Sequence, residues 1–144
     1  MNETTKTTDE LLKIISKSKN PQNTLHEVED NLLSYSIDEY LAILLDEKKL
    51  KCSQVVIKSN LNPNYAYQIF SGHKKNPSRD KLLALSIGMS LSIDETQKLL
   101  RIAGLSPLYP RIQRDLFIIY ALENSYTIIE TNALLDETGF DIIA

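Results

Sequence analysis

Residues 53–70 read SQVVIKSNLNPNYAYQIF, and this stretch decides the fold. Asn60 lies in its middle, and asparagine tolerates the positive φ of a left-handed turn better than any residue except glycine. Asn62 can then cap a helix, and Pro63 suits the first helical position because an amide hydrogen there would have no partner. The stretch therefore predicts two short helices joined by a tight turn.

The two expected helices cover residues 53–59 and 63–70. Their expected inward residues are Val55 and Val56 in the first helix, Leu61 between the helices, and Ala66, Ile69 and Phe70 in the second. The second helix would then present Asn64, Tyr65, Tyr67 and Gln68 outward. A short helix, a tight turn and a second helix with a polar outward face are the parts of a helix-turn-helix.

Helix signals continue on both sides of this stretch. Upstream, residues 37–49 carry apolar residues at helical spacing and predict another helix. Capping boxes occur at Thr7 with Glu10, Thr24 with Glu27, Ser36 with Glu39, Ser92 with Glu95, and Thr127 with Glu130. No stretch alternates apolar and polar residues for long enough to predict a strand. We therefore expect an all-α protein, with two N-terminal helices near residues 9–18 and 25–34.

Residues 79–105 recur as residues 114–140. Nine identities carry the repeat: Arg79 with Arg114, Asp80 with Asp115, Ser90 with Ser125, Ile93 with Ile128, Glu95 with Glu130, Thr96 with Thr131, Leu99 with Leu134, Leu100 with Leu135, and Gly104 with Gly139. Each copy predicts a helix, a capped turn and a second helix ending in glycine. We expect two stacked helical hairpins, in which the repeated Arg-Asp pair could be a structural device.

This organisation divides the chain into three expected parts. They are an N-terminal extension with two helices over residues 1–35, a helix-turn-helix DNA-binding domain over residues 36–105, and a C-terminal helical hairpin over residues 106–144 that packs on it. Two repeats are too few to stand alone as a solenoid, so the second should share the core of the first.

Charge is distributed unevenly along the chain. Residues 48–81 hold eight basic residues and one acidic residue, a balance of +7, while the remainder holds eight basic and 18 acidic residues, a balance of −10. Together these make the net charge of −3. One basic segment in an acidic chain indicates a face that meets phosphates, and a solvated charged face is the alternative.

Several classes of protein are not expected. The single cysteine, Cys52, allows no intramolecular disulfide and fits a reducing compartment. No apolar run has the length of a membrane span and residues 1–6 do not resemble a signal peptide, so we expect a cytoplasmic protein. His26 and His73 have no Cys or Glu at metal-ligand spacing, and no catalytic motif is present. We expect no metal, no cofactor and no enzyme activity.

The chain resembles the phage repressor/Cro-like helix-turn-helix family, also called the xenobiotic-response-element type, over about residues 36–104. The segments that carry this resemblance are residues 53–56, 60–62, 69–78, 82–85 and 91–95, and with residues 106–110 the chain looks like small transcriptional regulators of low-GC Gram-positive bacteria. The resemblance implies a lambda-repressor-like helix-turn-helix bundle, here extended at both ends. Cys52, Val56 and Asn60 stand where the family usually has glutamine, alanine and glycine.

The expected DNA-contacting residues lie in and beside the second helix of the motif. Asn64 and Gln68 are four residues apart, and each amide can pair with two atoms of an adenine in the major groove. Lys74 and Lys75 follow in a loop suited to phosphate contacts. The full expected set is Gln54, Asn62, Asn64, Tyr65, Gln68, His73, Lys74, Lys75 and Arg79.

These features predict a sequence-specific regulator that binds double-stranded DNA, with a second copy as the expected partner on a palindromic site. The alternative is a protein-interaction adaptor that has the fold but no longer reads DNA. The altered first motif helix and the acidic charge outside residues 48–81 leave this alternative open. A protein partner would then bind the N-terminal or C-terminal helices.

Overall fold

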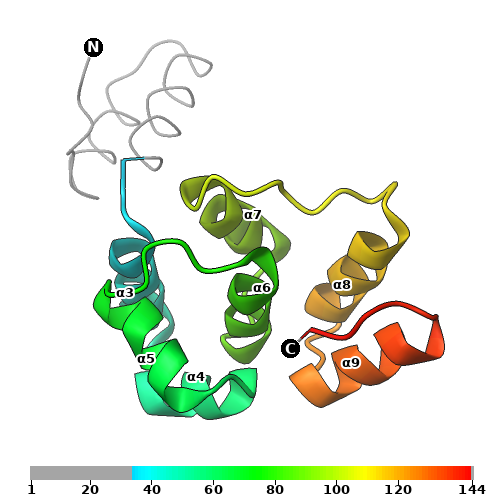
Figure 1. Ribbon diagram of the computed structural model, residues 1–144, viewed down its shortest axis with the longest axis horizontal. Coiled ribbons are helices and arrows are strands. Elements are labelled where there is room, and N and C mark those ends of the chain that lie inside the picture. Colours follow the sequence, from blue (N-terminus) through cyan, green and yellow to red (C-terminus); the bar gives the residue numbers. More distant parts are fainter. Residues whose placement is uncertain (1–33, 144) are drawn as a thin grey trace. The chain divides into compact units, whose positions relative to one another are not determined.

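The structure is a computed structural model that describes residues 34–143, and these form seven α-helices and no strand (Figure 1). The helices are α3 (Ile37–Lys48), α4 (Cys52–Ser59), α5 (Pro63–Ser71), α6 (Arg79–Gly88), α7 (Ile93–Ile102), α8 (Gln113–Glu123) and α9 (Ile128–Glu137). The expected all-α fold is confirmed. The helices expected near residues 9–18 and 25–34 lie outside the described residues. Within the described part, no helix combines the length and apolar character needed to cross a membrane.

The backbone between α4 and α5 follows the sequence prediction. Asn60 has a φ of 57° and is left-handed, and the side chain of Asn62 accepts a hydrogen bond from the amide of Tyr65 at 3.2 Å. Pro63 is the first residue of α5, which runs to Ser71, one residue beyond the expected end. The turn residue and the N-cap are therefore confirmed.

Helices α3, α4, α5 and α6 share one apolar core. Its buried side chains include Leu41, Leu44, Val55, Val56, Leu61, Ala66, Ile69, Leu82, Leu83 and Leu85. Phe70, expected inward, is only half-buried. Helix α4 packs on α6 at Gly88, where an added Cβ would lie 3.0 Å from the Val55 carbonyl oxygen and 3.0 Å from the Ser59 nitrogen. The two helix backbones can therefore approach closely only because this residue is glycine.

The sequence repeat is also a repeat of structure. We call residues 79–108 the first repeat unit and residues 114–143 the second repeat unit. Both second helices begin with a complete capping box, Ser92 with Glu95 in the first unit and Thr127 with Glu130 in the second. The left-handed backbone positions also correspond: Ser90 and Ser125 have φ of 53° and 54°, and Gly104 and Gly139 have φ of 71° and 86°. The predicted hairpins and glycine ends are thus confirmed.

The two repeat units exchange their arginine-aspartate pairs. Arg79 donates to both oxygens of Asp115, at 2.9 and 2.8 Å, and Arg114 donates to both oxygens of Asp80, at 3.0 Å each. Because each unit gives its arginine to the aspartate of the other, an approximate two-fold axis relates the units. This differs from the stacking of a solenoid, where each unit would bind its neighbour in one direction only.

Each unit also closes its own C-terminal end in the same way. The Gln97 side chain donates to the carbonyl oxygen of Leu108 and accepts from its amide, at 2.8 and 2.7 Å. Asn132 makes the same two bonds to Ile143, at 2.9 and 2.8 Å. Both segments after the second helices are therefore held by side chains from within their own unit.

Candidate nucleic-acid interface

Helix α5 has an exposed polar face opposite its buried one. Ala66 and Ile69 are fully buried, while Asn64 and Gln68 are exposed and lie one turn apart on the outer side. Tyr67, 43% exposed, lies on the same outer side. The two amides that the sequence selected are thus available to a molecule approaching α5.

Tyr65 connects this face to the lysines that follow it in the chain. The Nζ atoms of Lys74 and Lys81 each lie 5.5 Å from the centre of the half-buried Tyr65 ring. Both distances suit cation-π contacts, which hold the ammonium groups at the edge of α5. Lys75, in the same loop as Lys74, is exposed. Lys74, in the loop that follows α5, therefore lies beside this helix.

Lys81 was not among the residues selected from the sequence for this face. It is in the first turn of α6, and it reaches Tyr65 because α6 packs beside the motif helices. Its signal in the sequence was its place at the end of the basic segment. The structure therefore adds a third lysine to the polar face of α5.

Two basic residues of the same segment are engaged elsewhere. Lys48 pairs with Glu95 at 2.9 Å. Arg79, expected to contact phosphate, instead donates to Asp115 and to the carbonyl oxygens of Ser106 and Pro107. The interpretation of Arg79 as a phosphate contact is therefore corrected, because its guanidinium group joins the two repeat units.

The remaining selected residues lie around the motif with differing availability. Gln54 is exposed in the first turn of α4. Asn62 is exposed, but its side-chain oxygen already caps α5. The Nδ1 atom of exposed His73 lies 2.8 Å from the Ser71 hydroxyl. Gln54 is therefore the freest of the three to contact a ligand.

The start of α4 bears on how this helix could meet an anion. Its N-cap residue, Lys51, makes no side-chain capping bond, and its first turn contains no acidic residue. Uncapped amides at a helix N-terminus favour negative charge nearby. Burial raises the pKa of the neighbouring Cys52 thiol, so the thiol adds no negative charge at neutral pH. The start of α4 is thus electrostatically compatible with a phosphate.

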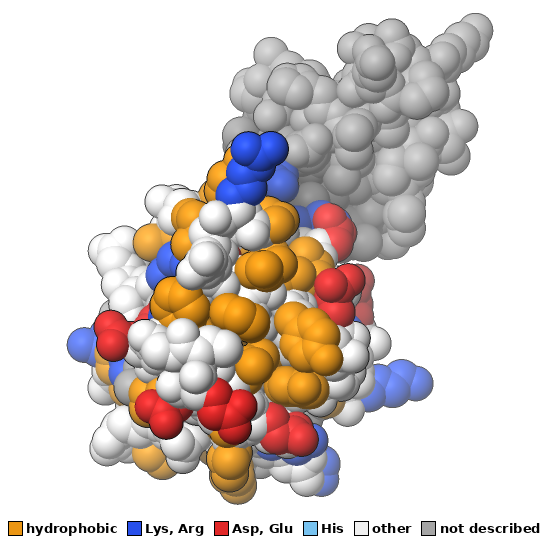
Figure 2. Space-filling model, turned by 90° about the vertical axis from the view of Figure 1, so that its right-hand side faces the viewer, with side chains coloured by type: hydrophobic (Ala, Val, Ile, Leu, Met, Phe, Trp, Pro, Cys, Tyr) orange, Lys and Arg blue, Asp and Glu red, His pale blue; other side chains and the backbone are white. Residues whose placement is uncertain are grey.

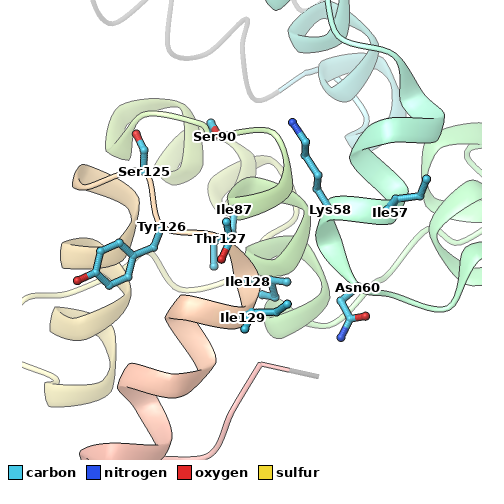
Figure 3. A pocket seen from close by; sticks show the side chains of 10 residues that line it. All are labelled: Ile57, Lys58, Asn60, Ile87, Ser90, Ser125, Tyr126, Thr127, Ile128 and Ile129. Atoms are coloured by element: carbon cyan, nitrogen blue, oxygen red, sulfur yellow. The ribbon is translucent and has the colours of Figure 1, made fainter.

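A hollow of about 310 Å³ lies near the turn residue, between α4, α6 and the start of α9 (Figure 3). Its apolar lining is Ile57, Ile87, Tyr126, Ile128 and Ile129, and its polar lining is Lys58, Asn60, Ser90, Ser125 and Thr127. The Ile57 and Ile129 side chains are 77% and 76% exposed. This hollow includes no residue of α5, so it is separate from the polar face.

The chain matches no protein-family model, no curated protein and no solved structure. The proposal for its function therefore depends on the residues and geometry described above.

Proposed function

We propose that the protein is a sequence-specific DNA-binding transcriptional regulator, in which α4 and α5 act as a helix-turn-helix of the repressor type. The observation that carries the proposal is the exposed pair Asn64 and Gln68 on α5, with Lys74 and Lys81 held at its edge by Tyr65. In this proposal α5 enters the major groove of double-stranded DNA in the cytoplasm of a bacterial cell.

The polar face offers the two kinds of contact that a sequence reader needs. An asparagine or glutamine amide can donate to N7 and accept from N6 of adenine in two-atom pairing, worth about 1–3 kcal/mol of discrimination for each base. Asn64 and Gln68 supply two such amides one helical turn apart. The proposed site should therefore contain adenines at the positions facing these residues.

The lysines supply affinity that does not depend on sequence. Lys74 and Lys75 follow α5, and Lys51 precedes α4. Each phosphate that such a residue neutralises releases counterions, which lowers log K by about 0.9 for each unit rise of log salt. Arg79 and Lys48 are left out of this set because both are paired within the protein.

The experiment is selection of bound duplexes from a random pool, followed by affinity measurements on the selected duplex from roughly 50 to 200 mM salt. We expect a palindromic consensus containing adenines, and Lys75→Ala should reduce the salt slope by about one phosphate contact. A selection that enriches no sequence, with equal affinity for all duplexes, would contradict the proposal. That result would favour the protein-interaction adaptor.

A further inference from the structure

Helix α8 has an apolar outer face. Ile112, Leu116 and Tyr120 are spaced four residues apart and are 53%, 45% and 50% exposed. The inner side of the same helix carries the buried residues Asp115, Ile118, Ala121 and Leu122. Figure 2 shows hydrophobic side chains gathered on the side of the molecule where α8 and α9 lie. We call Ile112, Leu116 and Tyr120 the α8 stripe.

The corresponding positions on α6, in the first repeat unit, provide a comparison for the α8 stripe. Tyr120 corresponds to Leu85, which is fully buried, and Glu123 corresponds to Gly88, where α4 packs against α6. Glu123 has the Cβ that Gly88 lacks, so a helix cannot approach α8 at this position as closely as α4 approaches α6 at Gly88. The α8 stripe therefore does not accept a helix in the close packing that α4 makes with α6.

Charges at the two ends of α8 indicate a different occupant. Arg111 precedes the helix, Glu123 ends it, and both are exposed. The two residues are 12 positions apart, α8 itself begins at Gln113, and Leu116 lies near the middle of the span. In an antiparallel pair of α8 helices centred on Leu116, Arg111 of each copy would lie about two residues, or about 3 Å, from the level of Glu123 of the other, which these long side chains can span.

We propose that the α8 stripe is the interface between two copies of this chain, packed antiparallel, α8 against α8, about a two-fold axis. Leu116 then meets Leu116 of the second copy at the axis, and Ile112 meets Tyr120. The stripe is complementary to a second, antiparallel copy of itself. The order of its apolar residues matches, and the opposite charges at the two ends of α8 face each other, so these contacts between different residues each occur twice. The proposal goes beyond the proposed function, since pairing through α8 requires no DNA.

The size of the surface sets the expected strength of the pair. Three large side chains that are each about half exposed offer on the order of 300 Å² of apolar surface per copy, within the range of functional patches. A standard interface buries about 800 Å² per partner, so this dimer belongs to the weaker class. We expect it to form and dissociate reversibly at micromolar concentrations.

The test is sedimentation equilibrium of the full chain without DNA, from roughly 1 µM to about 500 µM. The wild-type protein should change from monomer to dimer within this range. Leu116→Glu places two carboxylates together at the axis and should weaken the dimer at least about tenfold. Ile129→Glu is the matched control, because Ile129 is 76% exposed on α9 outside the stripe and its change should leave the dimer unaltered.

The antiparallel arrangement has its own test. Arg111→Glu and Glu123→Arg should each weaken the dimer, and the double variant should restore it, because the exchanged charges again face each other. Circular dichroism of each variant checks that the helices are intact. A wild-type chain that stays monomeric, a dimer unaffected by Leu116→Glu, or a double variant without rescue would overturn the proposal. In the case of a monomeric wild-type chain, the stripe would instead be a candidate surface for a different protein. Loss of DNA binding would not bear on this test.

Discussion

The two repeat units have the same scaffold but different outer faces. In the first unit, Leu85 is fully buried, and Gly88 lets α4 approach α6. In the second, Tyr120 and Glu123 occupy the corresponding positions and are exposed. The difference shows that the capping boxes, the glycine ends and the exchanged ion pairs are common to both hairpins, while the outer positions determine whether the helix face is covered within the chain.

The largest expected effect comes from truncating the corresponding outer residues. Leu85→Ala should reduce the free energy of unfolding by about 2–5 kcal/mol, because it opens a cavity in a fully buried site. Tyr120→Ala should cost less than about 1 kcal/mol, because the ring is half exposed. Urea unfolding followed by circular dichroism measures both. Equal losses would show that the two faces are buried alike.

The exchanged ion pairs should differ in the same way. Asp115 is 2% exposed and also accepts from the Tyr109 amide, whereas Asp80 is 34% exposed. Asp115→Asn should cost about 3 kcal/mol, because the Arg79 charge loses a buried partner, and Asp80→Asn should cost about 1 kcal/mol or less. Thermal unfolding at neutral pH distinguishes them. A larger loss for Asp80→Asn would contradict this ranking.

The contribution of the Asp115–Arg79 ion pair to stability should depend on pH. Burial by itself would raise the pKa of the Asp115 carboxyl, but hydrogen bonds from Arg79 and the Tyr109 amide outweigh it and hold the pKa below its usual value. An aspartate with a lowered folded pKa stabilises the protein above the unfolded pKa of about 3.9, and this contribution is lost as pH falls through the folded pKa. The wild type should therefore lose its advantage over Asp115→Asn below about pH 4. If the stabilities of the wild type and Asp115→Asn changed in parallel across that pH range, the lowered pKa of Asp115 would be contradicted.

The last comparison between the repeat units concerns Gly88, the glycine that lets α4 pack closely on α6. An alanine normally stabilises a helix relative to glycine by about 0.5–1 kcal/mol. Gly88→Ala should instead destabilise by about 1–3 kcal/mol, because its Cβ would meet backbone atoms of α4 at 3.0 Å. Glu123→Ala, at the corresponding position, should change stability by less than about 0.5 kcal/mol. Stabilisation by Gly88→Ala, measured by urea unfolding, would refute the close approach.

The sequence predicted local features better than those that join distant segments. Asn60, Asn62 and the capping boxes at Ser92 and Thr127 act on neighbouring residues, so their type and spacing were enough to predict them. The repeat was visible as identities, but the partner of Arg79 is 36 residues away, and a guanidinium group suits a phosphate as well as an aspartate.

The missed surface features have a similar cause. Lys81 reaches Tyr65 only through the packing of α6 beside the motif. The spacing of Ile112, Leu116 and Tyr120 is the same whether a helix face meets a core or solvent, so no pattern in one chain separates the two. Both features therefore needed the tertiary arrangement.

The central claim is that the polar face of α5 reads DNA. Its most direct test is fluorescence anisotropy of the selected duplex with the wild type and with the triple variant Asn64→Ala, Gln68→Ala and Lys75→Ala. Lys98→Ala with Asn124→Ala is the control, because Lys98 lies in α7 and Asn124 follows α8, whereas α5 packs mainly on α3 and α4. We predict at least about a 100-fold loss of affinity for the triple variant and less than about a threefold change for the control. A triple variant that binds within about threefold of the wild type would contradict the claim.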